Sequence, residues 1–448
     1  MNGRRILAQV ANGRRRPPQD VTGRRTLPQD VTGRRTLPQD VTGRRLLAQA
    51  QFVNSVGDGV YLVTSAFYFA RIVGLPAAEI GLGLTLGWGV GSVAGVPLGH
   101  LADRRGPRGV AVVLALLTAV AVASFMFVRS FAPFVLVACL YGTAQTGLSA
   151  ARQALLAGLV EPAERTVVRA VLQATLNGGL AVGAALGGIA LWLNTPAAYL
   201  TLFALDAVSF LVAAALLARL PAVRPAPVAA AASAATSSAA SSAARPKLSV
   251  LRDRPYAVVT LINAVMLLYM PLLSVVVPLW IAERTSAPSW VVSALLLINT
   301  GGVLLFQVRM ARRVKGLRRA SSSVRQAGLV MLAACAVFAL SPYGWVFLLV
   351  AAGLLVVGEM LLAAGAWEIS FGLAPDDRQG QYQGFFGSGV AVARMLGPVA
   401  LTALVLGGGT LGWLAVGAMF VTAGVAMAPA VRWSVRTAAG RRPPCWSA

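Results

Sequence analysis

Long apolar segments, separated by short polar ones, run through most of the chain. Twelve are found, at roughly 48–70, 78–100, 109–129, 132–157, 167–193, 198–219, 256–281, 289–309, 324–341, 345–371, 383–406 and 410–431. A helix needs about 20 apolar residues to cross a membrane. The segments have that length, and they are too long and too evenly apolar for the strands of a membrane barrel. The pattern predicts an all-α membrane protein with twelve transmembrane helices.

The segments form two groups of six with a polar stretch between them. We expect a tail at 1–45, a first six-helix bundle at 46–219, a linker at 220–254, a second bundle at 255–432 and a second tail at 433–448. The linker is rich in proline, alanine and serine, which is typical of flexible connections.

The first tail consists of five decapeptides related to VTGRRTLPQD. We interpret it as a disordered basic repeat; the alternative is an arm that binds anionic lipid. The fifth copy leads directly into the first apolar segment, so Val41 is a candidate start of translation. An intact mass that includes all five decapeptides would contradict that start.

Composition and charge agree with a membrane protein. The chain is 57% hydrophobic and 12% charged, with a mean hydropathy of +0.71, whereas a soluble domain has about 25% charged residues. Lys and Arg gather after the second, fourth, eighth and twelfth segments. The positive-inside rule then predicts a multi-pass protein of the inner (plasma) membrane with both termini in the cytoplasm. This asymmetry explains most of the net charge of +24, so we do not expect nucleic-acid binding.

The loop after the second segment reads GHLADRRGPRGV (99–110). It resembles the signature loop of the major facilitator superfamily, G-x-L-[AS]-D-R-x-G-[RK]-[RK]. Pro107 stands where a basic residue is usual, and the matching residues are Gly99, Leu101, Ala102, Asp103, Arg104, Gly106 and Arg108. The resemblance implies two pseudo-symmetric six-helix bundles with a substrate cavity between them, and transport by alternating access.

We expect this loop to act as a conformational latch between the bundles. The carboxylate of Asp103 can bind the amino end of a helix of the other bundle, where the helix dipole favours an anion. Arg104 and Arg108 can pair with acids or with the carboxyl ends of helices. Arg152, toward the cytoplasmic end of the fourth segment, is a further candidate for the latch.

Two glycine patterns predict close helix packing. The second segment has a glycine at every fourth residue from Gly83 to Gly99. These glycines form either a surface along which a helix of the second bundle slides or a static packing contact. The fifth segment resembles the motif G-x-x-x-G-P-x-x-G-G of the drug–proton antiporter branch, with Ala184 in place of the proline. The matching residues are Gly179, Gly183, Gly187 and Gly188. This resemblance implies proton-coupled antiport; ordinary close packing is the alternative.

Six charged residues lie three or more residues inside the ends of the expected spans: Asp58, Arg152, Asp206, Glu359, Glu368 and Arg394. A charge at the centre of the bilayer costs about 2.5–3.5 kcal/mol, so each needs a partner or a function. Asp58 is our first candidate for the proton-coupling site, because Asn54 lies one turn earlier on the same face and Gly57 and Gly59 leave space for water or substrate. A structural hydrogen bond is the alternative.

The other buried charges have different expected roles. Glu359 is the second proton-coupling candidate and is expected to pair with Arg394. Asp206 is a candidate for the cavity or for a structural charge pair. Glu368, near the cytoplasmic mouth, is expected to be structural.

No pattern indicates an enzyme, a cofactor or a metal site. His100 is the only histidine, the three cysteines have no metal-ligand spacing, and there is no phosphate-binding loop for ATP. An ion gradient is the remaining source of energy. We therefore predict a monomeric secondary transporter that exports lipophilic or cationic drug-like molecules in exchange for protons. The alternatives are proton-coupled uptake of a metabolite, and a receptor or membrane enzyme on the same fold.

Overall fold

The computed structural model describes residues 37–440 apart from 194, 223–248 and 289. Regular structure in these residues is entirely helical. The first half contains α1 (Leu37–Phe67), which continues as a π-helical turn (Tyr68–Val73), α2 (Ala77–Arg105), α3 (Pro107–Phe125), α4 (Phe131–Leu159), α5 (Arg165–Leu193) and α6 (Pro196–Ala218).

The second half begins with a short 3-10 helix (Ser249–Arg252) and an interrupted helix. The latter consists of α7 (Arg254–Met266), α8 (Tyr269–Pro271), a π-helical turn (Leu272–Val276) and α9 (Val277–Arg284). The remaining helices are α10 (Trp290–Arg313), α11 (Leu317–Ala339), α12 (Val346–Leu373) and α13 (Gln379–Gly440), with 3-10 turns at Ser341–Tyr343 and Asp376–Arg378.

In the described part of the chain, ten helices are long and apolar enough to cross a membrane. Helix α13 covers both of the last two expected spans. Gly409, which has a non-helical backbone (φ 56°, ψ −131°), divides it into two helical parts. The positive φ at this turn favours glycine. Helix α1, which covers the first expected span, is not among the ten. The count of twelve spans therefore stays a prediction.

The first helix begins earlier than expected. Residues 37–45, which we assigned to the tail, are helical, and Leu47 and Ala50 of the fifth decapeptide are buried in the first bundle. That copy has Ala48 and Ala50 where the two preceding copies have proline and aspartate. Alanine suits a helix interior and proline does not. The earlier decapeptides, most of the linker and residues 441–448 lie outside the described residues.

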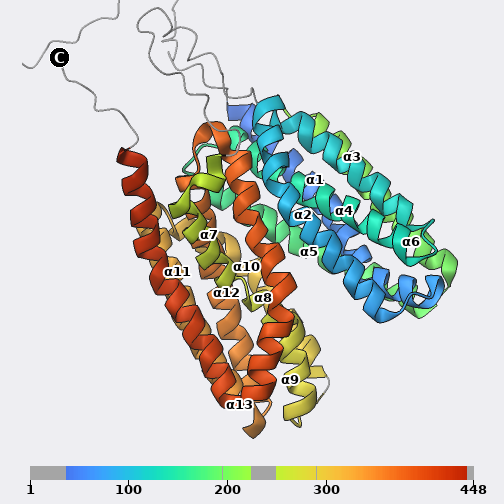
Figure 1. Ribbon diagram of the computed structural model, residues 1–448, viewed down its shortest axis with the longest axis vertical. Helices are drawn as coiled ribbons and strands as arrows, with labels where there is room; N and C mark the ends of the chain where they lie inside the picture. Colours follow the sequence, from blue (N-terminus) through green and yellow to red (C-terminus); the bar gives the residue numbers. More distant parts are fainter. Residues whose placement is uncertain (1–36, 194, 223–248, 289, 441–448) are drawn as a thin grey trace, which may run out of the picture.

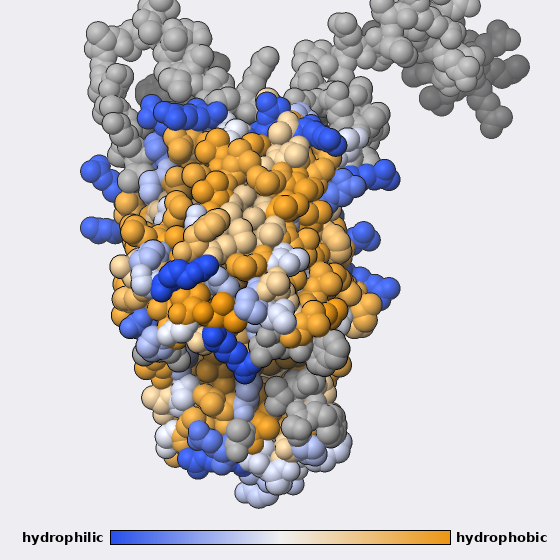
Figure 2. All heavy atoms as spheres, turned by 90° about the vertical axis from the view of Figure 1, so that its right-hand side faces the viewer, coloured by the Kyte–Doolittle hydropathy of each residue, from blue (hydrophilic) through white to orange (hydrophobic). Residues whose placement is uncertain are grey.

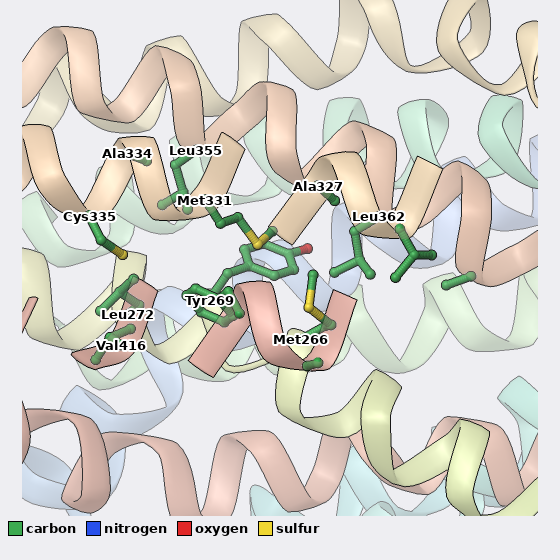
Figure 3. Packing of buried hydrophobic residues seen from close by; sticks show 14 of the residues in the cluster. Met266, Tyr269, Leu272, Ala327, Met331, Ala334, Cys335, Leu355, Leu362 and Val416 are labelled. Carbon is green, nitrogen blue, oxygen red and sulfur yellow. The ribbon is translucent and has the colours of Figure 1, made fainter. Parts of the chain in front are cut away.

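The two halves form separate bundles that meet at one end and diverge toward the other (Figure 1). The first bundle packs around aromatic residues that include Phe125, Phe134 and Phe203. The core of the second contains Met266, Tyr269 and Met331 (Figure 3). We call the end where the bundles meet the basic end, because the arginines that end α2 and α10 and begin α11 lie there. Hydrophobic side chains cover much of the middle of the outer face in Figure 2, as expected for a surface in contact with lipid.

The glycines of α2 divide between two partners. Gly87 and Gly91 pack against α4 of the same bundle, where an added Cβ would lie 2.6 Å from the oxygen of Ala138 and 2.4 Å from that of Gly142. Such distances leave no room for a side chain. This part of the stripe packs within the first bundle.

Gly95 and Gly99 instead face α13 of the second bundle. A Cβ at Gly95 would lie 3.4 Å from the oxygen of Gly384, and one at Gly99 would lie 2.1 Å from the oxygen of Gly380. The backbones of α2 and α13 therefore touch directly at the basic end.

The glycines of α5 mostly face α1. An added Cβ would lie 2.0 Å from the oxygen of Val56 at Gly183, 2.6 Å from Ser55 Cβ at Gly179 and 3.0 Å from Val63 Cβ at Gly187. Gly188 has no such neighbour within 4 Å. Three of the four motif glycines thus allow α1 and α5 to pack closely.

This contrast predicts different effects of alanine along one helix. Gly183→Ala should lower the free energy of unfolding by about 1–3 kcal/mol, because α1 and α5 must move apart. The matched control Gly188→Ala should be neutral or slightly stabilising, since alanine favours a helix. Thermal unfolding of the purified protein measures both. Equal stability of the two variants would contradict the packing.

Candidate functional site

Asp103 caps the first turn of α13, a helix of the other bundle. Its Oδ1 accepts the backbone N–H of Gly380 at 2.7 Å and its Oδ2 accepts that of Gln381 at 2.8 Å. These N–H groups have no partner within their own helix, and the helix dipole adds to the attraction for a carboxylate. One side chain of the first bundle thus supplies the N-cap of a helix of the second.

Glycines make this contact possible. An added Cβ at Gly380 would lie 2.5 Å from the oxygen of Gly99 and 2.8 Å from Oδ1 of Asp103. At Gly384 it would lie 2.4 Å from the oxygen of Gly95. Larger residues at these positions would separate α2 from α13 and move the carboxylate away from the N–H groups.

Three further contacts join the bundles at the basic end. Arg165 Nη1 lies 3.3 Å from Oδ1 of Asp376. The hydroxyl of Thr166 donates to the carboxylate of Glu368, which also accepts the Gly316 N–H at 2.7 Å. The guanidinium of Arg169 lies over the ring of Trp367, 5.6 Å from its centroid. We call these three contacts, together with the Asp103 cap, the interbundle lock.

Arg104, Gly106 and Arg108 of the signature loop are not part of the interbundle lock. Arg108 Nη1 donates to the backbone oxygen of Leu220 at 2.9 Å, just after α6. Arg104 is exposed. Gly106 has a φ of 95° between α2 and α3, a conformation that favours glycine.

Arg152, which we expected in the latch, lies elsewhere. It is two turns inside α4, and its Nη2 donates to Oδ1 of Asn54 at 2.8 Å. The depth of position 152 places the guanidinium beside α1 rather than at the interface between the bundles. Arg152 is therefore not part of the latch, contrary to our prediction.

Gln381 is a central residue of the basic end that the sequence did not reveal. Its Oε1 accepts hydrogen bonds from the hydroxyl of Ser249 at 3.0 Å and from the N–H of Val250 at 3.2 Å. Its Nε2 lies 3.3 Å from Nδ1 of His100. Because these partners are more than one hundred residues away along the chain, no local pattern could have identified it.

Asp58 lies in a polar cluster between α1 and α4. Its Oδ2 accepts from Nδ2 of Asn54 at 2.6 Å and its Oδ1 accepts from Nε2 of Gln145 at 2.9 Å. The structure thus brings together Asn54, Asp58 and Arg152. Gln145 was missed, although it lies seven residues before Arg152 on the same face of α4.

We expected the glycines beside Asp58 to leave space for water or substrate. The structure shows that neighbouring helices occupy this space. A Cβ at Gly57 would lie 2.2 Å from Oδ1 of Asp206, and one at Gly59 would lie 2.5 Å from the oxygen of Leu180. They allow α6 and α5 to pack on α1, so the open space near Asp58 lies on another side.

That space is a cavity of about 140 Å³ within the first bundle. Its polar wall consists of Gln51, Asp58, Gln145, Ser149, Arg152, Gln153 and Arg169. Its apolar wall consists of Ala50, Leu47, Leu156, Leu172, Leu176 and Leu217. The cavity therefore combines charged groups with a lipophilic surface.

Asp206 is not part of this cavity. It is fully buried between α6 and α1, and its Oδ1 lies 3.4 Å from the hydroxyl of Ser209. No ion pair involves Asp206 among the described residues. The expected role as a cavity or charge-pair residue is not what the structure shows.

Glu359 and Arg394 do not form the expected pair. Oε2 of Glu359 accepts from Nδ2 of Asn299 at 2.7 Å. Arg394 lies over the ring of Trp88, 5.8 Å from its centroid. Arg394 thus points across to α2 of the other bundle, and no ion pair joins it to Glu359 in the described structure. Nor do three or more His, Cys, Asp or Glu side chains gather as metal ligands in the part of the chain described.

The sequence matches the family model of the Major Facilitator Superfamily over residues 47–398. The chain belongs to the major facilitator superfamily. Its members are secondary transporters, so this protein is a transporter and not an enzyme. The drug–proton antiporter branch stays a prediction. No curated protein matches the sequence significantly.

Solved transporters have a similar fold. The human organic anion transporter MFSD10 (TETRAN) gives a TM-score of 0.61 at 17% identity, covering 89% of this chain and 100% of that one. A bacterial homologue of the iron transporter ferroportin, in an outward-facing state, gives 0.66 at 14% identity, covering 88% and 99%. The same homologue with soaked iron gives 0.66 at 15% identity, with the same coverage. At these identities the likeness concerns the fold alone.

The Asp103 cap predicts a strong effect of one conservative change. Asp103→Asn should leave membrane insertion intact and lower the transport rate in proteoliposomes by about tenfold or more. The amide loses a charge-assisted contact worth about 1.5–3 kcal/mol in one conformational state.

A matched control is available in the same structure. Asp253 caps α7, where its Oδ1 accepts the Tyr256 N–H at 3.3 Å within the second bundle. Asp253→Asn should therefore transport at close to the wild-type rate. A wild-type rate for Asp103→Asn would remove the argument for the lock.

Proposed function

We propose that this superfamily member is a proton-coupled exporter of lipophilic drug-like molecules, with Asp58 as its proton site. One observation carries the proposal. The carboxylate of Asp58 lines a cavity, and the hydrogen bonds to its two oxygens come from the neutral amides of Asn54 and Gln145. Such a carboxylate can take up a proton without breaking a direct ion pair.

Alternating access is supported by the contrast between the two ends. The interbundle lock joins the bundles at the basic end, while they diverge at the other end (Figure 1). Opening at the basic end requires the Asp103 cap and the Arg165–Asp376 pair to break. With the basic end in the cytoplasm, as the charge pattern predicts, this arrangement is an outward-facing state. We propose that the protein works as a monomer in the inner membrane.

The lipophilic character of the substrate is supported by the leucines of the cavity wall. A cationic substrate was also expected from the charge of Asp58. However, both Asp58 oxygens already accept hydrogen bonds, and Arg152 and Arg169 line the same cavity. We therefore propose a lipophilic substrate, as expected, but do not propose that it is cationic.

Neutralising the proton site tests the proposal. Asp58→Asn should abolish accumulation of a lipophilic dye driven by an imposed pH gradient in proteoliposomes. Some downhill exchange should persist, because the variant mimics a permanently protonated carrier.

The control is the neighbouring carboxyl that does not line the cavity. Asp206→Asn should retain pH-driven accumulation. Unchanged uphill transport with Asp58→Asn would exclude Asp58 as the coupling site, and Glu359→Gln would then test the second candidate in the same assay.

A further inference from the structure

Two arginines line the cavity without a carboxylate partner. Among the described residues, neither Arg152 nor Arg169 forms an ion pair. Burying a charge is costly unless it is paired. Asp58 supplies one negative charge to the lining, whereas the arginines supply two positive ones.

Neutral groups occupy only part of each guanidinium. Arg152 Nη2 donates to Asn54, while its Nε is buried with no hydrogen-bond partner in the described structure. Arg169 Nη1 and Nη2 face the amide oxygen of Gln153 at 2.7 and 3.2 Å. The pair is therefore under-compensated both in charge and in hydrogen bonds.

The size and the wall of the cavity restrict which ligand could compensate the positive charge of the two arginines. About 140 Å³ is less than the roughly 300 Å³ or more of a site for a whole drug-sized molecule. It suffices for a carboxylate or phosphate group, which arginine binds through two parallel hydrogen bonds. Leu172 and Leu176, which belong to α5 like Arg169, also line the cavity and add an apolar surface to its wall.

We propose that this cavity binds the anionic head group of a lipophilic substrate, held between Arg152 and Arg169. The proposal rests on the proposed transport function and names its substrate class as amphiphilic organic anions. The ring of Trp367 covers the Arg169 guanidinium while the lock is closed. The guanidinium of Arg169 is therefore fully accessible to an anion from the basic end only when the bundles separate there. Substrate binding from that side is thus linked to the inward-open state.

Binding to the purified full-length protein in nanodiscs of zwitterionic lipid tests the proposal without a pH gradient. The probes are octanoate, its neutral analogue octanamide and the cation octylammonium; octyl phosphate and inorganic phosphate form a second set. Apparent affinity is obtained from the rise of the thermal unfolding temperature with probe concentration. Octanoate or octyl phosphate should stabilise the wild type, and octanamide and octylammonium should not.

Two variants and a matched control assign the site. Arg169→Gln and Arg152→Gln should each weaken anion binding about tenfold to a hundredfold, because a charge-assisted contact is lost. Arg152 is not part of the lock, so its effect cannot come from opening the bundles. Arg284 also lies over a tryptophan, Trp280, and donates to a carbonyl, that of Leu406, but at the other end of the second bundle. Arg284→Gln should bind anions like the wild type.

Several results would overturn the proposal. They are equal stabilisation by octanamide or octylammonium, equal stabilisation by inorganic phosphate and octyl phosphate, and unchanged anion binding in both arginine variants that fold. None of them bears on proton coupling, which Asp58→Asn tests separately. Loss of coupling in Asp58→Asn with no selective anion binding would leave the proposed function standing without this substrate class.

Discussion

The contact between Asp103 and the amino end of α13 determines how the rest of this structure is arranged. It satisfies two N–H groups that α13 cannot satisfy itself, and it does so from the other bundle. Gly99 and Gly380 let the backbones approach closely enough for the carboxylate to reach them. Arg165, Thr166 and Arg169 at the start of α5 then meet the second bundle at the same end. Closure there leaves the bundles apart at the other end.

The polar groups inside the first bundle divide into two kinds. Asp206 is fully buried against the backbone of α1 at Gly57 and lies outside the cavity. Asp58, Arg152 and Arg169 line the cavity and are held by amide side chains. Only the second kind lines a cavity, so depth in the membrane alone does not distinguish the two kinds. Arg169 belongs both to the cavity and to the lock, so the anion that we propose for the cavity would be connected through it to the conformational state.

The sequence predicted the helical fold and its family because both depend on regular patterns: long apolar segments, and a loop with fixed spacing around Asp103. It also placed Asn54 with Asp58, since they lie one turn apart. It failed where contacts depend on how helices rotate against each other. Glu359 and Arg394 have similar depth but point to different partners, and Gly57 and Gly59 pack against neighbouring helices instead of opening space. Gln381 and Gln145 were missed because neutral amides carry no distinctive signal in an apolar chain.

Distances between spin labels at the basic end test the central role of the Asp103 cap most directly. Labels at Arg105 and Asp377, both exposed, report on the lock, and labels at Phe127 and Tyr343 report on the other end. In a variant whose native cysteines are replaced by serine, the account predicts a short, narrow distance for the first pair. With Asp103→Asn that distance should lengthen and broaden, while the second pair should come closer. A first-pair distance that is long in the parent protein, or unchanged by Asp103→Asn, would contradict the account.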